Sequence, residues 1–419
     1  MAKAMDGEGY KKALKNFHKV SGRHVLAVEA DMPYQDVQKV VALSDRIRKA
    51  GNELVALMRK NYAQLMRTKR YRKLLALYGG TENERKREKL AAQLKKMQES
   101  YDVTWDFCRG SMIAIKEKYG VDAIFALTKA EDIWRGMKEC LYGSGRTVHF
   151  SKYGDLPCIR AKQINRGIVL SAEGGSLKFK IGGLCFGIRP GDRFQQDEVD
   201  AVLSYLAGPE EADREAVGAF LRNGSATDTH RPCYATLVPK MIRGRYRVYL
   251  HLTIEGKAAP KYRKDGSPRH KYGKGTVGAD IGTQTVAYTS GTECGLKNLA
   301  ERGRGILASE RKERLILRAM DRSRRATNPQ NYNADGTVRK GRKAWRYSNH
   351  YKKLRARHSE LCRTNAVNRQ LAINEDANRL RGLGDAFVTE PKNAARLMKR
   401  VKETTKNSKG KSNLSLIHI

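Results

Sequence analysis

The chain has 419 residues, which at about 150 residues per domain corresponds to two or three domains and excludes a single small module. Lys and Arg number 83 against 44 Asp and Glu, so the formal charge is +39. Such an excess repels itself unless a polyanion neutralises it, and nucleic acid is therefore the expected partner.

Apolar residues make up 40% of the chain, and no stretch approaches 18 uninterrupted apolar residues, which excludes a membrane-spanning helix. The N-terminus is polar and lacks the apolar segment of a secretory signal. We therefore expect a cytoplasmic, nucleoid-associated protein with no membrane partner. The seven cysteines are scattered singly, without a CxxC pair, which indicates reduced thiols and predicts no zinc site in these residues.

The first part of the chain predicts one strand followed by a helical block. Residues 22–31 alternate like a strand, and apolar residues recur at helical spacing over 35–67. Further helical patterns make 35–144 an all-helical block. The apolar stripe of 35–67 favours core packing over a partner-binding groove.

From residue 146 onward, short β-type runs punctuated by glycine predict a small barrel or sandwich. Residues 234–239 and 246–254 are the clearest hairpin. The simplest assembly adds the early strand to this β-module, with the helical block inserted between them. A stretch rich in Pro, Gly and basic residues follows at 258–275. Its cations could neutralise phosphates and its tyrosines could stack on bases, although a solvated loop is an equal alternative.

The segment VGADIGTQTVAYTS reads as a strand, a glycine-bounded turn and a second strand, with Asp280 near the end of the first. A carboxylate there is costly unless a cation or ligand uses it, and Mg²⁺ is the natural cation. DAFVTE predicts a short buried strand that ends in Glu390. Two such carboxylates on neighbouring strands could hold two metals about 4 Å apart for hydrolysis. The alternative is purely structural: one acid caps a turn and the other ends a strand.

Positive charge is concentrated between these two segments, with 19 Lys and Arg against 6 acids over 301–365. Basic helices are predicted at 307–325 and 343–379. Aromatics among the cations could stack on bases, or could pack inward from an amphipathic helix. The candidate nucleic-acid contacts, including those of the basic stretch before residue 275, are Arg263, Lys264, Lys271, Arg324, Arg325, Arg342, Lys343, Arg346, Tyr347, Lys352 and Lys353.

VGADIGTQTVAYTS resembles the first RuvC-type nuclease motif of the TnpB family, the transposon-encoded RNA-guided endonucleases related to type V CRISPR effectors. AFVTEPKN is similar to the second motif, with Glu390 and Asn393 matching and Pro391 and Lys392 departing from it. The resemblance implies guide RNA and target DNA as partners and Mg²⁺-dependent DNA cleavage by a two-metal site, with Asp280 and Glu390 as catalytic metal ligands. In such a complex the guide RNA would recognise the target sequence by base pairing, and the positively charged protein surface would recognise the geometry of the nucleic-acid backbone.

The fold that the resemblance implies is α+β and multidomain: a wedge-type β-barrel with an inserted helical recognition domain, followed by an RNase H-like, RuvC-type α/β nuclease domain. The expected domains are a leader and first wedge strand (1–34), the helical recognition domain (35–144), the wedge barrel (145–274) and an incomplete nuclease domain (275–413). The family pattern also has a zinc ribbon and a third acid after Glu390, whereas the only later acid here is Glu403. We therefore expect structural Zn²⁺ only in a missing C-terminal part.

The last six residues, 414–419, match the translation of a sequencing adaptor, and we expect them to be read-through. Without the third carboxylate the 419-residue form is expected to cut negligibly. Two other functions are open. A non-catalytic RNA- or DNA-binding protein has the same composition. DIGTQ also resembles the first phosphate loop of actin and Hsp70-like ATPases, but the charge and the absence of a second glycine-rich phosphate loop argue against an ATPase.

Overall fold

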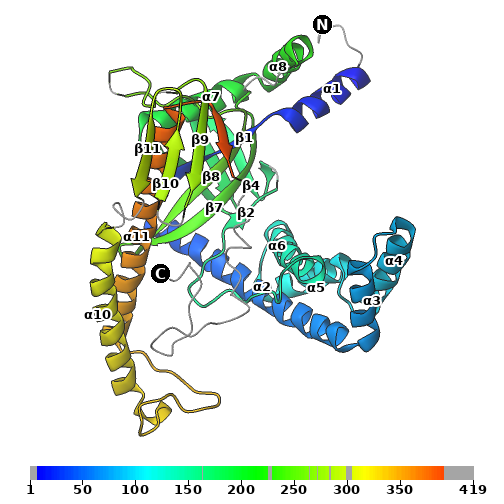
Figure 1. Cartoon of the computed structure of the whole chain (residues 1–419), viewed down its shortest axis with the longest axis vertical. Helices are drawn as coiled ribbons and strands as arrows, with labels where there is room; N and C mark the ends of the chain where they lie inside the picture. Colours follow the sequence, from blue (N-terminus) through cyan, green and yellow to red (C-terminus); the bar gives the residue numbers. More distant parts are fainter. Residues whose placement is uncertain are drawn as a thin grey trace. The chain divides into compact units, whose positions relative to one another are not determined.

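The computed structural model describes residues 7–162, 164–224, 229–263, 265–270, 272–282, 285–298 and 304–390, with only the backbone at 304–308. The chain divides into two compact units, residues 1–260 and 261–419. Figure 1 shows a mixed α/β architecture in which one sheet curls into a half-barrel. Within the described ranges, no helix has both the length and the apolar character needed to cross a membrane.

The first unit begins with one helix and one strand, which are followed by five helices, five strands, two helices and a hairpin. They are α1 (Gly7–Val20), β1 (Arg23–Asp31), α2 (Tyr34–Arg67), α3 (Lys69–Gly79), α4 (Glu84–Ser100), α5 (Trp105–Tyr119), α6 (Ala123–Tyr142), β2 (Ile159–Arg160), β3 (Asn165–Arg166), β4 (Ile168–Glu173), β5 (Ser176–Ile181), β6 (Leu184–Arg189), α7 (Arg193–Ala207), α8 (Pro209–Asn223), β7 (Pro232–Ile242) and β8 (Arg245–Glu255).

The predicted joining of the early strand to the β-module is confirmed. The sheet has the order β2-β7-β8-β1-β6-β5-β4-β3, so β1 lies in its middle, antiparallel to both β8 and β6. The predicted hairpin is also present as β7 and β8. Its two turn residues, Arg243 and Gly244, have φ of +49° and +79°, the combination that a two-residue hairpin turn needs to match strand twist.

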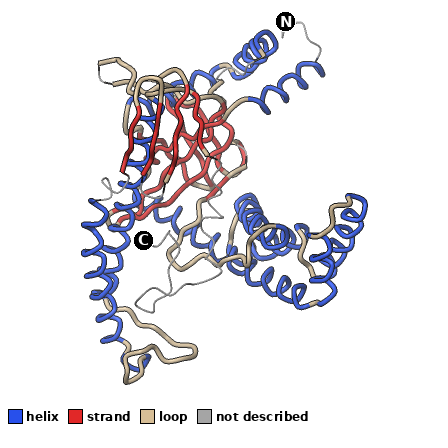
Figure 2. Tube along the Cα trace, in the orientation of Figure 1, coloured by secondary structure: helices blue, strands red, loops and turns tan. Residues whose placement is uncertain are grey.

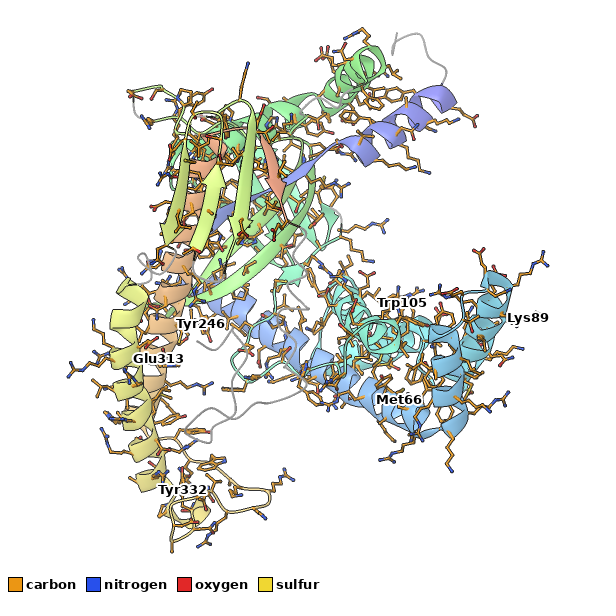
Figure 3. All side chains as sticks on the ribbon, in the orientation of Figure 1. Met66, Lys89, Trp105, Tyr246, Glu313 and Tyr332 are labelled. Carbon is orange, nitrogen blue, oxygen red and sulfur yellow. The ribbon has the colours of Figure 1, made fainter. Side chains whose placement is uncertain are left out.

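The helical block and the half-barrel share one hydrophobic core. Helix α2 contributes Leu54 and Met58, both fully buried, to the same cluster as Leu250 of β8 and Ile159 of β2. Polar contacts reinforce the joint, since the Ser44 hydroxyl donates to the carbonyl of Pro157 at 2.5 Å. The apolar stripe of α2 is therefore core, as its spacing indicates. Figure 3 labels Met66 and Trp105 on the packed helices of this block.

Two helices interrupt the region that the sequence assigns to a barrel alone. α7 and α8 cover residues 193–223, and α8 packs on α1 through Phe17 and Phe220, whose rings meet edge to face at 5.9 Å. Helix α7 also buries Glu198 completely. That carboxylate accepts hydrogen bonds from His24 Nε2 of β1, at 2.7 Å, and from the backbone amide of Ala259.

The second unit is a four-stranded sheet and a long antiparallel helix pair. Its elements are β9 (Thr276–Ile281), β10 (Thr285–Thr289), β11 (Cys294–Asn298), α10 (Arg304–Thr327), the 3-10 turn η2 (Pro329–Asn331), α11 (Asn349–Arg381) and β12 (Ala386–Thr389). The strand order is β11-β10-β9-β12, with β10 antiparallel and β12 parallel to β9. Figure 2 shows the two helices side by side with their connecting loop at one end.

One expectation for β12 is wrong. The strand exists where the sequence predicts it, but it is exposed along its whole length rather than buried, with Phe387 at 45% and Val388 at 62% of their full accessibility. The physical reason is its place in the sheet, because it lies at the edge of the described strands and pairs with β9 alone. The four predicted domain boundaries remain predictions.

Candidate metal and nucleic-acid site

The two candidate carboxylates lie at the same edge of two adjacent parallel strands. In the register of β9 and β12, Ala279 is opposite Thr389. The next position along each strand places Asp280 opposite Glu390, which follows β12 directly. Side chains at paired positions of a sheet point to the same face, so the register directs both carboxylates to one side. Both residues are exposed.

The strand on the other side of Asp280 offers a small side chain. Ala287 of β10 is its partner in the antiparallel ladder. The turn after β9 is closed by the Gly282 amide, which donates to the carbonyl of Thr285 at 2.8 Å. A methyl group on one side and a carboxylate on the other leave Asp280 accessible to a ligand that approaches the edge of the sheet.

Backbone contacts before each strand set this register. The amides of Asp385 and Ala386 both donate to the carbonyl of Gly275, at 3.0 and 3.1 Å. The Asp385 carboxylate in return accepts from the Gly275 amide at 2.9 Å. A methyl group on Gly384 would meet that same carbonyl and would lie 2.8 Å from Val277 Cγ2. Only glycine fits this approach, so Gly384 is a positioning residue that the sequence analysis missed.

The last turns of α11 are tied to the sheet by a polar network. Arg379 donates to the Tyr288 hydroxyl at 2.8 Å and to the Glu293 carboxylate at 2.9 Å, and Tyr288 donates to Glu293 at 2.6 Å. The hydrogen bonds from Tyr288 and Arg379 hold the pKa of Glu293 below its ordinary value. An ion pair between Lys297 and Asp376 adds a second tie. Helix α11 therefore reaches β12 from a fixed position on this sheet.

The donor set fits Mg²⁺, which proteins usually hold through one or two carboxylates together with substrate phosphates. The other residues compared with the second motif, Pro391, Lys392 and Asn393, lie outside the described residues, as do the one later acid, Glu403, and residues 414–419. In the described part of the chain, Asp280 and Glu390 do not belong to a group of three or more clustered metal-ligand side chains.

At the far end of the helix pair, residues 328–348 form an ordered loop, here called the basic loop. Asn328 is fully buried and donates to the carbonyl of Arg346 at 2.8 Å, while the Arg346 amide donates back to it at 2.7 Å. Tyr332, labelled in Figure 3, packs edge to face against Trp345 at 5.8 Å. Trp345 thus packs inward, but it does so from the loop, because α11 begins at Asn349 and not at residue 343 as predicted.

The predicted nucleic-acid contacts in this region fall into two groups. Arg324 and Arg325 both donate to Asp321, and their guanidinium groups lie over the rings of Trp345 and Tyr332, so they hold the loop together. The others are at the surface: Tyr347 is 42% exposed and stacks on Tyr351, Lys343 is half-buried, and Arg342, Arg346, Lys352 and Lys353 are exposed.

The structure does not bring the basic loop and the carboxylates together. The basic loop precedes α11, whereas the sheet contacts this helix at Asp376 and Arg379, so at 1.5 Å per residue about 40 Å of helix lies between the loop and the sheet. Of the contacts predicted before residue 275, Arg263 is exposed, and its amide donates to the carbonyl of Ser267 at 2.8 Å. Lys264 and Lys271 lie outside the described residues.

No protein-family model matches the sequence, and no characterised protein matches it either. Among solved structures, the chain is similar to the cryo-EM structure of a Cas12f1–sgRNA–target DNA complex. The two share 11% sequence identity with a TM-score of 0.39, over 88% of this chain and 81% of the other.

Proposed function

We propose that this chain is a TnpB-type, RNA-guided DNA endonuclease in which Asp280 and Glu390 bind Mg²⁺ and the basic helix pair binds nucleic acid. The observation that carries the proposal is the parallel register of β9 and β12, which sets two carboxylates 110 residues apart in sequence opposite each other at one exposed strand edge. Carboxyl ends of parallel strands are where open α/β sheets bind ligands.

The charge distribution supports a polyanionic substrate at this unit. Exposed cations crowd the basic loop and the helices that lead from it to the sheet. Each Lys or Arg that neutralises a phosphate adds affinity without reading sequence, which leaves recognition of the target to a guide. Mg²⁺, when bound, would supply Lewis-acid stabilisation of a phosphodiester under attack. The two carboxylates would hold the ion, and the basic surface would orient the strand.

The proposal is tested by cleavage of plasmid DNA by the guide-RNA complex of the longest protein that the locus encodes, with and without Mg²⁺. We expect Asp280→Asn and Glu390→Gln each to abolish cutting while RNA affinity stays within a factor of about two of the parent. Asp265→Asn, which removes an exposed acid from a turn of the same unit, is the matched control and should cut normally. Unchanged cutting by Asp280→Asn would refute the assignment.

Metal binding by the 419-residue chain can be followed apart from cleavage. Fe²⁺ bound in a Mg²⁺ site reduces added hydrogen peroxide to hydroxyl radicals, which cut the nearby backbone. Fragments ending near residues 280 and 390 are therefore expected, and both should disappear in the variant that combines Asp280→Asn with Glu390→Gln. Retained RNA binding without these fragments, and without Mg²⁺-dependent cutting, would favour the non-catalytic binding protein instead.

A further inference from the structure

A second set of metal-binding side chains lies midway along the helix pair, away from the two carboxylates. His358 and Cys362 of α11 face Glu313 of α10, which Figure 3 labels. His358 Nε2 is 3.0 Å from Glu313 Oε1 and 3.6 Å from Cys362 Sγ, and Sγ is 3.9 Å from Oε1. Among the His, Cys, Asp and Glu side chains of the described residues, these three form a group whose ligand atoms all lie within 4.8 Å of one another.

The helix geometry holds the three ligands in place. His358 and Cys362 are four residues apart, so they lie one above the other on the same face of α11. Asn365 donates to the Ser309 hydroxyl at 2.7 Å on one side of the cluster. On the other side, the hydroxyls of Ser323 and Ser348 are 2.9 Å apart. These contacts fix the antiparallel register of α10 and α11, and therefore which side chains meet.

We propose that Glu313, His358 and Cys362 form a Zn²⁺ site with an open fourth position. Zinc bonds of about 2.0–2.3 Å in a tetrahedron separate a sulfur from a nitrogen or an oxygen by about 3.6 Å, and a nitrogen from an oxygen by about 3.4 Å. The three observed separations, 3.6, 3.9 and 3.0 Å, each lie within about 0.4 Å of those values. Small side-chain rotations would complete the geometry.

The ligand types select zinc over magnesium. Thiolate and imidazole are preferred ligands of Zn²⁺, whereas Mg²⁺ takes oxygen. A carboxylate and a thiolate together carry a charge of −2, which neutralises the ion on a helix pair that is otherwise strongly basic. Cys362 is exposed and Glu313 and His358 are half-buried, so the fourth position faces solvent and is open to water or to a phosphate oxygen.

This inference goes beyond the proposed nuclease function, because the site would clamp α10 to α11 between the basic loop and the sheet whether or not the protein cuts DNA. The sequence predicts no zinc site here, because the three ligands come from two helices and have none of the CxxC spacing that marks zinc-binding sequences.

Cobalt substitution of the purified full chain tests the site directly. We expect one Co²⁺ per chain, with the d–d absorption of a tetrahedral ion and a thiolate charge-transfer band, displaced by stoichiometric Zn²⁺ but not by excess Mg²⁺. His358→Ala and Cys362→Ser should weaken Co²⁺ binding at least tenfold. The matched controls His350→Ala and Cys294→Ser alter exposed residues of the same unit and should bind normally. A tetrahedral band that survives in Cys362→Ser would overturn the proposal.

Alkylation kinetics give a second measurement that needs no variant. Zn²⁺ should slow modification of the Cys362 thiol at least tenfold while leaving the exposed Cys294 thiol unchanged, as read by mass spectrometry of tryptic peptides. Equal rates at Cys362 with and without Zn²⁺ would show that Glu313 and His358 form only an ion pair, and would refute the site.

Discussion

Gly384→Ala tests whether close backbone packing positions the carboxylate pair. The added methyl group would meet the Gly275 carbonyl and approach Val277 Cγ2 to 2.8 Å, closer than side-chain carbons pack. Its main obstacle is backbone, so β12 has to shift away from β9 and weaken the two hydrogen bonds to Gly275. Overpacking of this kind costs about 1–3 kcal/mol.

Hydrogen exchange of the peptide that covers residues 385–389 measures this loss. When the strand opens locally, a cost of 1–3 kcal/mol raises the exchange rates of the β12 amides by about 5- to 150-fold, since 1.4 kcal/mol is a factor of ten. Metal-dependent backbone cutting near Glu390 should fall in parallel, although neither carboxylate is changed. Gly291→Ala, where the new methyl group has nothing within 4 Å, is the control. Parent-like exchange in Gly384→Ala would refute the close-packing argument.

Three further predictions concern other parts of the chain. Burial raises the pKa of the Cys108 thiol to about 12, so alkylation at pH 8 should modify the exposed Cys185 and leave Cys108 intact until the protein unfolds; modification of both at one rate would contradict this. Burial of Glu198 acts to raise the pKa of its carboxyl group, but the hydrogen bonds from His24 and from the Ala259 amide outweigh burial and hold that pKa below the ordinary value of 4.5. The ionised carboxylate therefore stabilises the first unit above pH 4.5, and this stabilisation is lost progressively in acid. Urea unfolding of Glu198→Gln should accordingly depend less on pH than that of the parent. Arg342→Ala should reduce the slope of log affinity for single-stranded RNA against log salt by about 0.7, and an unchanged slope would exclude a phosphate contact there.

The parts of the fold that sequence predicts are those in which one local pattern determines the outcome. Helix α2 keeps its apolar spacing from Val37 to Leu65, about eight turns, and the observed helix begins at Tyr34, one residue before the predicted start. The hairpin of β7 and β8 depends on a two-residue turn with glycine in second place. In both cases the deciding interactions lie within a few residues of each other.

The parts that sequence does not predict depend on contacts between distant residues. The apolar residues of β12 predict a buried strand, yet burial depends on the strands and helices that pair and pack with it, and β12 lies at the edge of the described sheet. The requirement for Gly384 appears only once Gly275, more than a hundred residues earlier, is beside it. Likewise, nothing in the local sequence distinguishes Arg324, which packs on Trp345, from Arg342, which is exposed.

The length of α11 sets a minimum size for any ligand that uses both ends of the second unit. B-DNA rises about 3.4 Å per base pair, so the roughly 40 Å of α11 between the basic loop and Asp376, where the helix contacts the sheet, corresponds to about 12 base pairs. Only a ligand at least this long could contact the basic loop and the sheet at the same time. A duplex of 8 base pairs can occupy one end at a time, and binding should tighten abruptly once oligonucleotides become long enough to span the helix.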